Sequence, residues 1–232
     1  MQQITNINLW DLDGTVINSA HRVLPLLDSA GNLDLNRYRN EACKHELIIQ
    51  DSLLPLVELM RRQMSAPNTI NYIITARAMS KSDYYFLRKQ GLRGRNGDNI
   101  QVFSRDTIHK FAPLESVKHI YNSRDADYKA FYFDHIIRLH GRDNVNYTMY
   151  DDHKGVLEKA REYGFNAIDA TQLNEMLTIG IQLASEQFLE ETISDDLDID
   201  YLNQRLSFAW QQLTEEEQEY YSVKYPKLAQ AV

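Results

Sequence analysis

Short apolar runs that stop at polar, mostly acidic, residues limit what this chain can fold into more than any other feature. Three such runs cover residues 4–10, 70–75 and 145–150, and stretches with helical spacing separate them. Apolar strands that alternate with helices predict a parallel sheet with helices on both faces. Because ligands of such sheets bind beyond the carboxyl ends of the strands, the residues at these ends are candidates for a functional site. They are Asp11, Asp13, Thr75, Arg77, Asp151 and Asp152.

The other predicted elements keep this alternation up to about residue 170. Asp51 is expected to begin a helix by capping its N-terminus, since apolar residues follow at helical spacing as far as Met60. Further helices are predicted over 80–90, 128–140 and 154–163, and further short strands over 100–103 and 165–168. The sequence therefore predicts one Rossmann-like α/β domain over residues 1–170.

Residues 171–232 differ from the rest of the chain in pattern and in charge. They contain no strand signal, and three helices are expected there, the second over 197–213 and the third behind a Thr214–Glu217 capping box. They hold 12 acidic and 3 basic side chains, so they account for the net charge of −8 of the whole chain. We interpret them as an acidic helical extension, packed on the α/β domain or on a second copy of the chain in a homo-oligomer.

Composition narrows the class of protein. With 43% hydrophobic and 25% charged residues, the chain suits a soluble globular protein. No apolar run approaches the roughly 18 residues of a membrane span, so no membrane partner is expected. Cys43 is the only cysteine, which excludes an internal disulfide and favours a cytoplasmic location. The basic stretch 76–110 predicts either a solvated helix face or a patch that attracts a phosphorylated substrate.

The strand-end residues favour one kind of chemistry. Four carboxylates in one crevice repel each other and raise each other's pKa values unless a cation neutralises them. Oxygen ligands of this kind suit Mg²⁺, which takes one or two carboxylates together with water and substrate phosphate. Thr75, Arg77 and Lys129 supply a hydroxyl, a guanidinium and an ammonium, the groups that hold a phosphate. Together they describe phosphoryl transfer through an aspartyl-phosphate.

At this level of detail the sequence resembles the haloacid dehalogenase superfamily of phosphohydrolases. The resemblance rests on D-x-D-G-T at 11–15, I-T-A-R at 74–77, Lys129, and Y-D-D at 150–152, and it covers about residues 4–170. D-x-D-G-T behind an apolar run is fairly specific, and the four elements in this order are a strong signal. The other interpretations are that D-x-D-G is only a turn, that Asp152 only caps a helix, or that Lys110 or Lys118 takes the place of Lys129.

The resemblance implies a role for each matching residue. Asp11 would be the nucleophile, and Asp13 the general acid and base whose backbone carbonyl also binds Mg²⁺. Asp11, Asp151 and Asp152 would complete the metal site. Thr75, Arg77 and Lys129 would hold the phosphoryl oxygens, and Gly14 would let the backbone turn close to the phosphate.

The substrate depends on what covers the site. Residues 16–50 leave room for a loop or a few short helices only, so we expect a minimal cap and an open site. The closer resemblance is to the phosphatase domain of polynucleotide kinase-phosphatases, because Arg22 follows the first motif and Asp125 lies one helical turn before Lys129. It implies that Arg22 also binds the substrate phosphate. The same resemblance implies a nucleotide or polynucleotide 3′-phosphatase, although no kinase P-loop is present. Arg22 and Asp125 could equally be a surface residue and a helix cap.

Two alternatives remain open at this point. One is a small-metabolite phosphatase with a tight pocket under the C-terminal helices. The other is a non-enzymatic module of the same fold that presents its acidic helices to a partner. The intact set of motifs counts against this module, since a scaffold does not require all four carboxylates.

Overall fold

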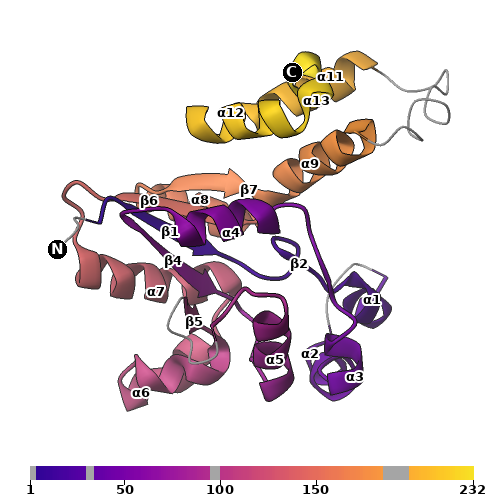
Figure 1. The fold of residues 1–232 in the computed structure, drawn as a ribbon. Helices are drawn as coiled ribbons and strands as arrows, with labels where there is room; N and C mark the ends of the chain where they lie inside the picture. The colour runs from indigo at the N-terminus through magenta and orange to yellow at the C-terminus, as the bar shows by residue number, and fades with distance from the viewer. Residues whose placement is uncertain (1–3, 30–33, 95–99, 185–198) are drawn as a thin grey trace. The chain divides into compact units, whose positions relative to one another are not determined.

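The computed structural model describes residues 4–29, 34–94, 100–184 and 199–232. A five-stranded sheet in the order β5-β4-β1-β6-β7 forms its centre (Figure 1). The strands are β1 (Asn6–Trp10), β4 (Thr69–Ile74), β5 (Gln101–Phe103), β6 (Asn146–Asp151) and β7 (Asn166–Asp169). β1 pairs in parallel with both β4 and β6, and β4 pairs in parallel with β5. The carboxyl ends of β1, β4 and β6 therefore meet at one edge, as predicted.

Helices cover both faces of the sheet, which confirms the predicted α/β class. The helices of this part are α4 (Val57–Ser65), α5 (Lys81–Lys89), η3 (Arg105–Lys110), α6 (Leu114–Tyr121), α7 (Asp125–His140) and α8 (Lys154–Glu162). Ile7 and Leu9 of β1 belong to the buried core that α7 and α8 share. Strand side chains alternate between faces, so Asn8 and Trp10 point to the opposite face, where Asn8 donates to Gln63 of α4 at 3.4 Å.

A small cap, residues 19–50, is inserted between a two-stranded ribbon of β2 (Ile17–Asn18) and β3 (Ser52–Leu53). Over its described residues, 19–29 and 34–50, its regular elements are short helices, as expected for a minimal cap. They are α1 (Ala20–Val23), η1 (Leu24–Leu26), α2 (Leu35–Arg37), η2 (Tyr38–Ala42) and α3 (His45–Ile48). Helix α3 contacts α5, so the cap lies against the same part of the molecule that follows β4 (Figure 1).

Two predictions about helices were wrong. Asp51 does not cap a helix, because residues 52–53 pair with β2, the amide of Leu54 donates to the carbonyl of Val16 at 3.0 Å, and α4 begins only at Val57. The connection before Lys129 contains a helix that periodicity did not indicate. This helix, α6, is only eight residues long and none of them is fully buried, although Val117, Ile120 and Tyr121 pack partly buried against the core.

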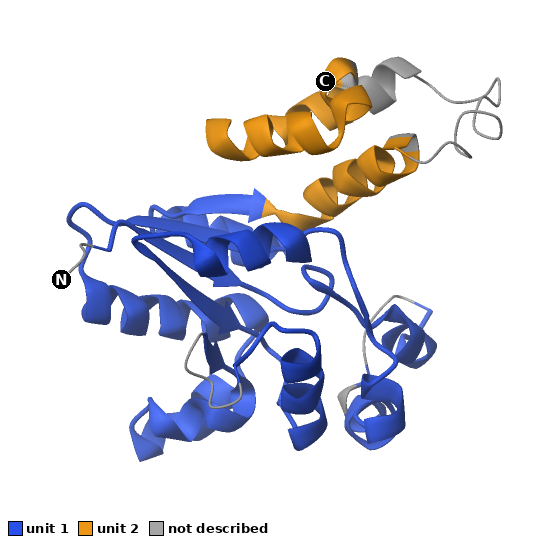
Figure 2. Cartoon of the chain, in the orientation of Figure 1, with its two compact units in different colours: residues 1–168 blue, residues 169–232 orange. Residues whose placement is uncertain are grey.

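The C-terminal residues form a separate compact unit, residues 169–232, shown in orange in Figure 2. It contains α9 (Ala170–Ala184), α11 (Ile199–Trp210), α12 (Glu215–Lys224) and α13 (Pro226–Ala231). The predicted capping box starts α12: Thr214 accepts from the amide of Glu217, whose carboxylate accepts from the amide of Thr214 at 2.9 Å. The parts of the predicted helices that fall within 185–198 lie outside the described residues. Over the described ranges, no helix is long and apolar enough to cross a membrane.

Candidate active site

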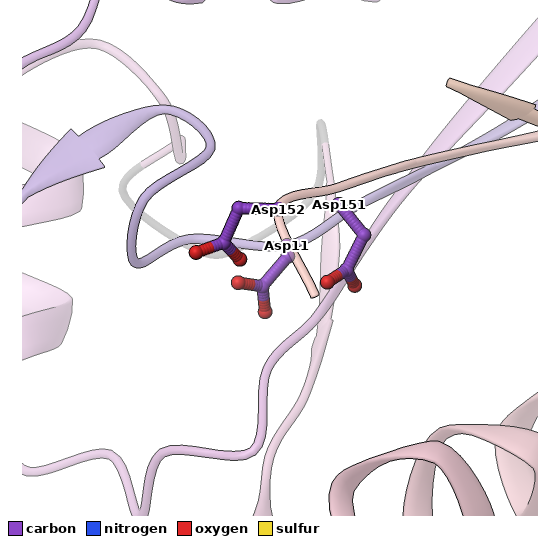
Figure 3. Close-up of side chains that lie close together, drawn as sticks. All are labelled: Asp11, Asp151 and Asp152. Carbon is purple, nitrogen blue, oxygen red and sulfur yellow. The ribbon is translucent and has the colours of Figure 1, made fainter. Parts of the chain in front are cut away.

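Three carboxylates converge at the ends of β1 and β6. Asp11 directly follows β1, Asp151 is the last residue of β6, and Asp152 comes next. The amide of Asp11 donates to the carbonyl of Tyr150 at 3.0 Å, which fixes the two strand ends beside each other. Each of the three residues offers a carboxylate oxygen within 4.8 Å of the other two (Figure 3). The structure thus brings together three of the four predicted metal ligands through their side chains.

Lys129 of α7 lies between two of these carboxylates. Its Nζ donates to Asp11 at 2.7 Å and to Asp151 at 2.6 Å, and its side chain is buried. Lys110 and Lys118, the alternatives considered from the sequence, are exposed. We call Asp11, Lys129, Asp151 and Asp152 the Lys129 site.

Negative charge exceeds positive charge in the Lys129 site, and the pKa values reflect this. Burial raises the pKa of Asp11; Lys129 opposes the shift, and the charges of Asp151 and Asp152 add to it. Burial, with the charge of Asp151, also raises the pKa of Asp152 to about 6. Burial lowers the pKa of Lys129, but Asp11 and Asp151 outweigh it and hold this pKa above its usual range. The site holds three carboxylates and only one ammonium, and carboxylate oxygens are hard ligands. It therefore suits a bound Mg²⁺ ion.

The loop after β1 approaches Asp152 so closely that any side chain at Gly14 would have to push the Asp152 carboxylate aside. Gly14 has φ +74°, a left-handed conformation that other residues rarely adopt. A Cβ atom on Gly14 would lie 2.2 Å from Oδ2 of Asp152. Gly14 therefore lets the first motif and the acidic pair share one site.

Asp13, two residues after Asp11, has different partners. Nε of Arg77 donates to Oδ2 of Asp13 at 3.0 Å, Nη2 of Arg77 donates to Oδ1, and Oγ of Ser19 donates to Oδ1 at 2.5 Å. Nη1 of Arg77 donates to Asp83 of α5 at 2.6 Å. Burial raises the pKa of Asp13, but Arg77 and Ser19 outweigh it, so this pKa lies below its usual value.

Arg22 and Asp51 form a bidentate ion pair beside Arg77. Nε and Nη2 of Arg22 each lie 2.7 Å from a carboxylate oxygen of Asp51, and both side chains are fully buried. Asp51 also lies 3.7 Å from Nη2 of Arg77. We call Asp13, Arg22, Asp51, Arg77 and Asp83 the Arg77 cluster. The predicted roles of Arg22 and Arg77 in phosphate binding stay predictions, since both guanidinium groups are paired with carboxylates here.

Asp51 and Asp83 are the members of the Arg77 cluster that sequence reasoning did not select. Asp83 stands three residues after Ser80, and that spacing indicates the capping box that starts α5. No signal of this kind connects Asp51 with Arg22. Their pairing depends on how the cap folds back on the ribbon.

Thr75 and Asp125 both come between Asp11 and Lys129 in the sequence. Thr75 is 1% exposed, and its hydroxyl accepts from the amide of Arg77 at 3.2 Å. Asp125 accepts from Arg105 at 2.7 Å, and Arg105 also donates to the carbonyl of Ala76 at 2.7 Å. Asp125 is not the cap of α7, because Arg124 is the N-cap residue of that helix. Through Arg105, Asp125 connects the start of α7 to the residues after β4.

The structure also decides between two pairs of interpretations from the sequence, one for Asp152 and one for the basic stretch 76–110. Asp152 is not the cap of α8, since His153 is its N-cap residue and the amide of His153 donates to Asp151 at 2.9 Å. The basic stretch 76–110 is not one patch of free cations. Arg77 and Arg105 are in ion pairs, and the guanidinium of Arg93 lies 4.6 Å from the ring centre of Tyr84.

Fold and site together define the class of protein. A parallel sheet with D-x-D-G-T after β1, T-x-R after β4, a buried lysine on α7 and two aspartates at the end of β6 is the arrangement expected of a haloacid dehalogenase-type phosphatase, a phosphoric monoester hydrolase. The family described as bacteriophage T5 5′-deoxynucleotidase matches residues 1–231. A 5′-deoxynucleotidase from Escherichia phage T5 is 56% identical over 219 residues, which cover 94% of this chain and 89% of the relative. The chain therefore belongs to the bacteriophage T5 5′-deoxynucleotidase family.

A solved structure is also similar. A haloacid dehalogenase-like family hydrolase from Streptococcus pneumoniae aligns with 71% of this chain and 83% of its own, at 16% identity and a TM-score of 0.46. The matching family and the relative from phage T5 are both described as 5′-deoxynucleotidases. They do not specifically support the closer resemblance to polynucleotide kinase-phosphatases.

Proposed function

We propose that this protein is a Mg²⁺-dependent nucleotidase that hydrolyses deoxynucleoside 5′-monophosphates through an aspartyl-phosphate on Asp11. The observation that carries the reaction type is the Lys129 site, where three carboxylates converge and one buried ammonium neutralises only part of their charge. The substrate class rests on the 56% identity to the 5′-deoxynucleotidase of phage T5.

Asp11 and Lys129 would perform the first bond exchange. A carboxylate oxygen of Asp11 attacks the phosphorus atom, the bond from phosphorus to O5′ breaks, and the phosphoryl group is carried on Asp11. Lys129 donates to Asp11 at 2.7 Å, so its ammonium is placed to neutralise the phosphoryl oxygens as they arrive. Thr75, buried at the end of β4, supplies a hydroxyl at the same edge.

Asp13 would move the protons. In its protonated form Asp13 gives a proton to O5′ as the deoxynucleoside leaves, and it regains a proton from the water that attacks the aspartyl-phosphate. The products are the deoxynucleoside and inorganic phosphate, and Asp11 returns to its free carboxylate. A carboxylate two residues after the nucleophile suits this exchange, because alternate residues of an extended chain point to the same side.

Asp11, Asp151 and Asp152 would hold Mg²⁺, together with the backbone carbonyl of Asp13. When bound, the ion would neutralise the excess negative charge of the site and polarise the phosphoryl group. This assignment agrees with the raised pKa values of Asp11 and Asp152, which indicate too little positive charge around them.

The polynucleotide 3′-phosphatase predicted from the sequence is the alternative substrate class. It depends on Arg22 and Asp125, which are paired here with Asp51 and Arg105. The relative of phage T5 is named for the 5′ position, so we give that class priority. The small-metabolite phosphatase and the non-enzymatic module remain further outcomes of the same test.

The test is phosphate release by the full chain from a panel of monoesters. The panel contains deoxynucleoside 5′-monophosphates, their 3′ isomers, a 3′-phosphorylated oligonucleotide and a sugar phosphate, each with Mg²⁺ and with EDTA. We expect the 5′-deoxynucleotides to be the best substrates and EDTA to abolish turnover. Asp11→Asn should lower kcat by about 10³-fold or more, because the nucleophile is lost.

Asp127→Asn is the matched control, because Asp127 is an exposed acid in the first turn of α7. It should turn over like the unmodified protein. Activity that persists in Asp11→Asn contradicts the nucleophile, activity that persists in EDTA contradicts the metal, and a preference for 3′-phosphates contradicts the substrate class.

A further inference from the structure

We infer that Arg77 is a positioning residue that fixes the carboxylate of Asp13, and that it does not bind the substrate phosphate. The inference rests on the proposed function, in which Asp13 transfers protons. All three nitrogens of the Arg77 guanidinium donate to carboxylates: Nε and Nη2 to Asp13, and Nη1 to Asp83. The side chain of Arg77 is 2% exposed.

The contact between Arg77 and Asp13 restricts how Asp13 can turn. Two nitrogens of one planar guanidinium bind the two oxygens of one carboxylate, and such a fork fixes the plane of the carboxylate as well as its distance. Ser19 donates to Oδ1 of Asp13 from the start of the cap. Asp13 is therefore held in one orientation, although its side chain is still 35% exposed and open to a substrate.

Arg77 is itself held from two sides by elements that carry no reacting group. On one side, Oδ2 of Asp83 accepts from the amide and the hydroxyl of Ser80, at 2.7 and 2.6 Å, so the N-terminus of α5 anchors it. On the other side, Asp51 lies 3.7 Å from Arg77 and is anchored by Arg22 of α1. A phosphate would have to displace these carboxylates from the guanidinium.

The consequence for catalysis depends on the leaving group. A leaving oxygen that is strongly basic needs a proton from Asp13 as its bond to phosphorus breaks, whereas a weakly basic one departs without a proton. Proton transfer is sensitive to small displacements of the donor. Loss of Arg77 should therefore affect esters with basic leaving groups, such as deoxynucleotides, far more than activated aryl phosphates.

The experiment measures kcat/KM of the full chain for a series of aryl phosphates of increasing leaving-group basicity and for a deoxynucleoside 5′-monophosphate. This ratio reports the steps up to release of the leaving group, so hydrolysis of the aspartyl-phosphate does not enter. Arg77→Met should lower kcat/KM for the deoxynucleotide by on the order of 10²-fold and leave 2,4-dinitrophenyl phosphate almost unchanged. For Arg77→Met, the plot of log kcat/KM against leaving-group basicity should become as steep as the same plot for Asp13→Asn. In the double variant, Arg77→Met should add little to Asp13→Asn.

Asp83→Asn and Ser80→Ala form a matched pair that does not depend on how well Arg77→Met folds. Both weaken the capping box of α5, but only Asp83 touches Arg77. Asp83→Asn should steepen the plot to an intermediate degree, and Ser80→Ala should leave it unchanged. Arg77→Lys should recover only part of the loss, because an ammonium cannot form the fork.

An unchanged slope together with an equal rise in KM for every ester would show that Arg77 binds the phosphate, and would overturn the inference alone. Equal slopes for Asp83→Asn and Ser80→Ala, both unlike the unmodified protein, would also overturn it. If the unmodified chain hydrolyses none of these esters, the proposed function fails, and the inference falls with it.

Discussion

Asp11 and Asp13 are the same residue type two positions apart, and burial acts on both, yet their pKa values shift in opposite directions. The pKa of Asp11 is raised and that of Asp13 is lowered. Asp11 shares a single ammonium, that of Lys129, with Asp151 and lies next to Asp152. Asp13 has the guanidinium of Arg77 and a serine hydroxyl.

The difference lies in the balance of charge around each carboxylate. The Lys129 site sets three carboxylates against one cation, and the Arg77 cluster sets three against two. The first arrangement leaves negative charge for a metal ion to neutralise, and the second is nearly satisfied by its own side chains. The Lys129 site therefore lacks positive charge where the nucleophile and the metal are proposed, whereas the Arg77 cluster has enough positive charge to hold the carboxylate of Asp13 in position.

The largest effect on this comparison should come from breaking the Arg77 cluster at Arg22. Arg22→Met leaves the carboxylate of Asp51 buried without its bidentate partner, so we expect a loss of about 3–5 kcal/mol in the free energy of unfolding. Equilibrium unfolding in urea measures it. Arg22→Met/Asp51→Leu, which removes both charges, should recover most of the loss.

The matched control for that prediction is Arg37→Met. Arg37 forms an ion pair with Glu41 at 3.0 Å in which both side chains are 49% exposed, and such solvated pairs add little to stability. If Arg22→Met and Arg37→Met destabilise the protein equally, the Arg22–Asp51 pair is not the structural support that its burial indicates.

A smaller effect is expected from lowering the negative charge of the Lys129 site. Asp152→Asn removes one of the three proposed carboxylate ligands, so the Mg²⁺ concentration for half-maximal activity should rise by about 10–100-fold. Without metal, the same variant should melt no lower than the unmodified protein, because repulsion with Asp11 and Asp151 is relieved. Thermal melts with EDTA and with Mg²⁺ test this apart from activity. An unchanged Mg²⁺ requirement would exclude Asp152 as a ligand.

Sequence reasoning reached the parallel sheet and the strand-end residues because both depend on local patterns. Apolar runs, breaks and acidic ends lie within a few residues of one another, and a parallel sheet brings its strand ends together. Lys129 could be selected from the sequence only by its spacing in a family motif.

The sequence did not identify the Arg77 cluster, because its partners are distant in the chain. Arg77 lies 64 residues from Asp13, and Arg22 lies 29 residues from Asp51. The first pair depends on the pairing of β1 with β4, and the second on the position of the cap against the ribbon, and no periodicity in the sequence indicates either. The start of α4 was predicted at the wrong residue for a related reason. Asp51 forms a buried ion pair and residues 52–53 pair with β2, so these residues do not begin the helix.

The smallest effect is expected from Gly14→Ala, which tests the strain of a positive φ and the contact with Asp152 separately. Gly14→Ala places a methyl group 2.2 Å from Oδ2 of Asp152, and the exposed carboxylate can move aside. We expect about 1 kcal/mol of destabilisation from the positive φ and a severalfold rise in the Mg²⁺ requirement, in the same direction as Asp152→Asn. Gly91→Ala is the control, because Gly91 has φ +70° but no atom within 4 Å of the added Cβ. Gly91→Ala should be destabilised to a similar degree without a change in Mg²⁺ requirement. Equal Mg²⁺ requirements for the two variants would show that metal binding does not depend on the position of Asp152 next to Gly14.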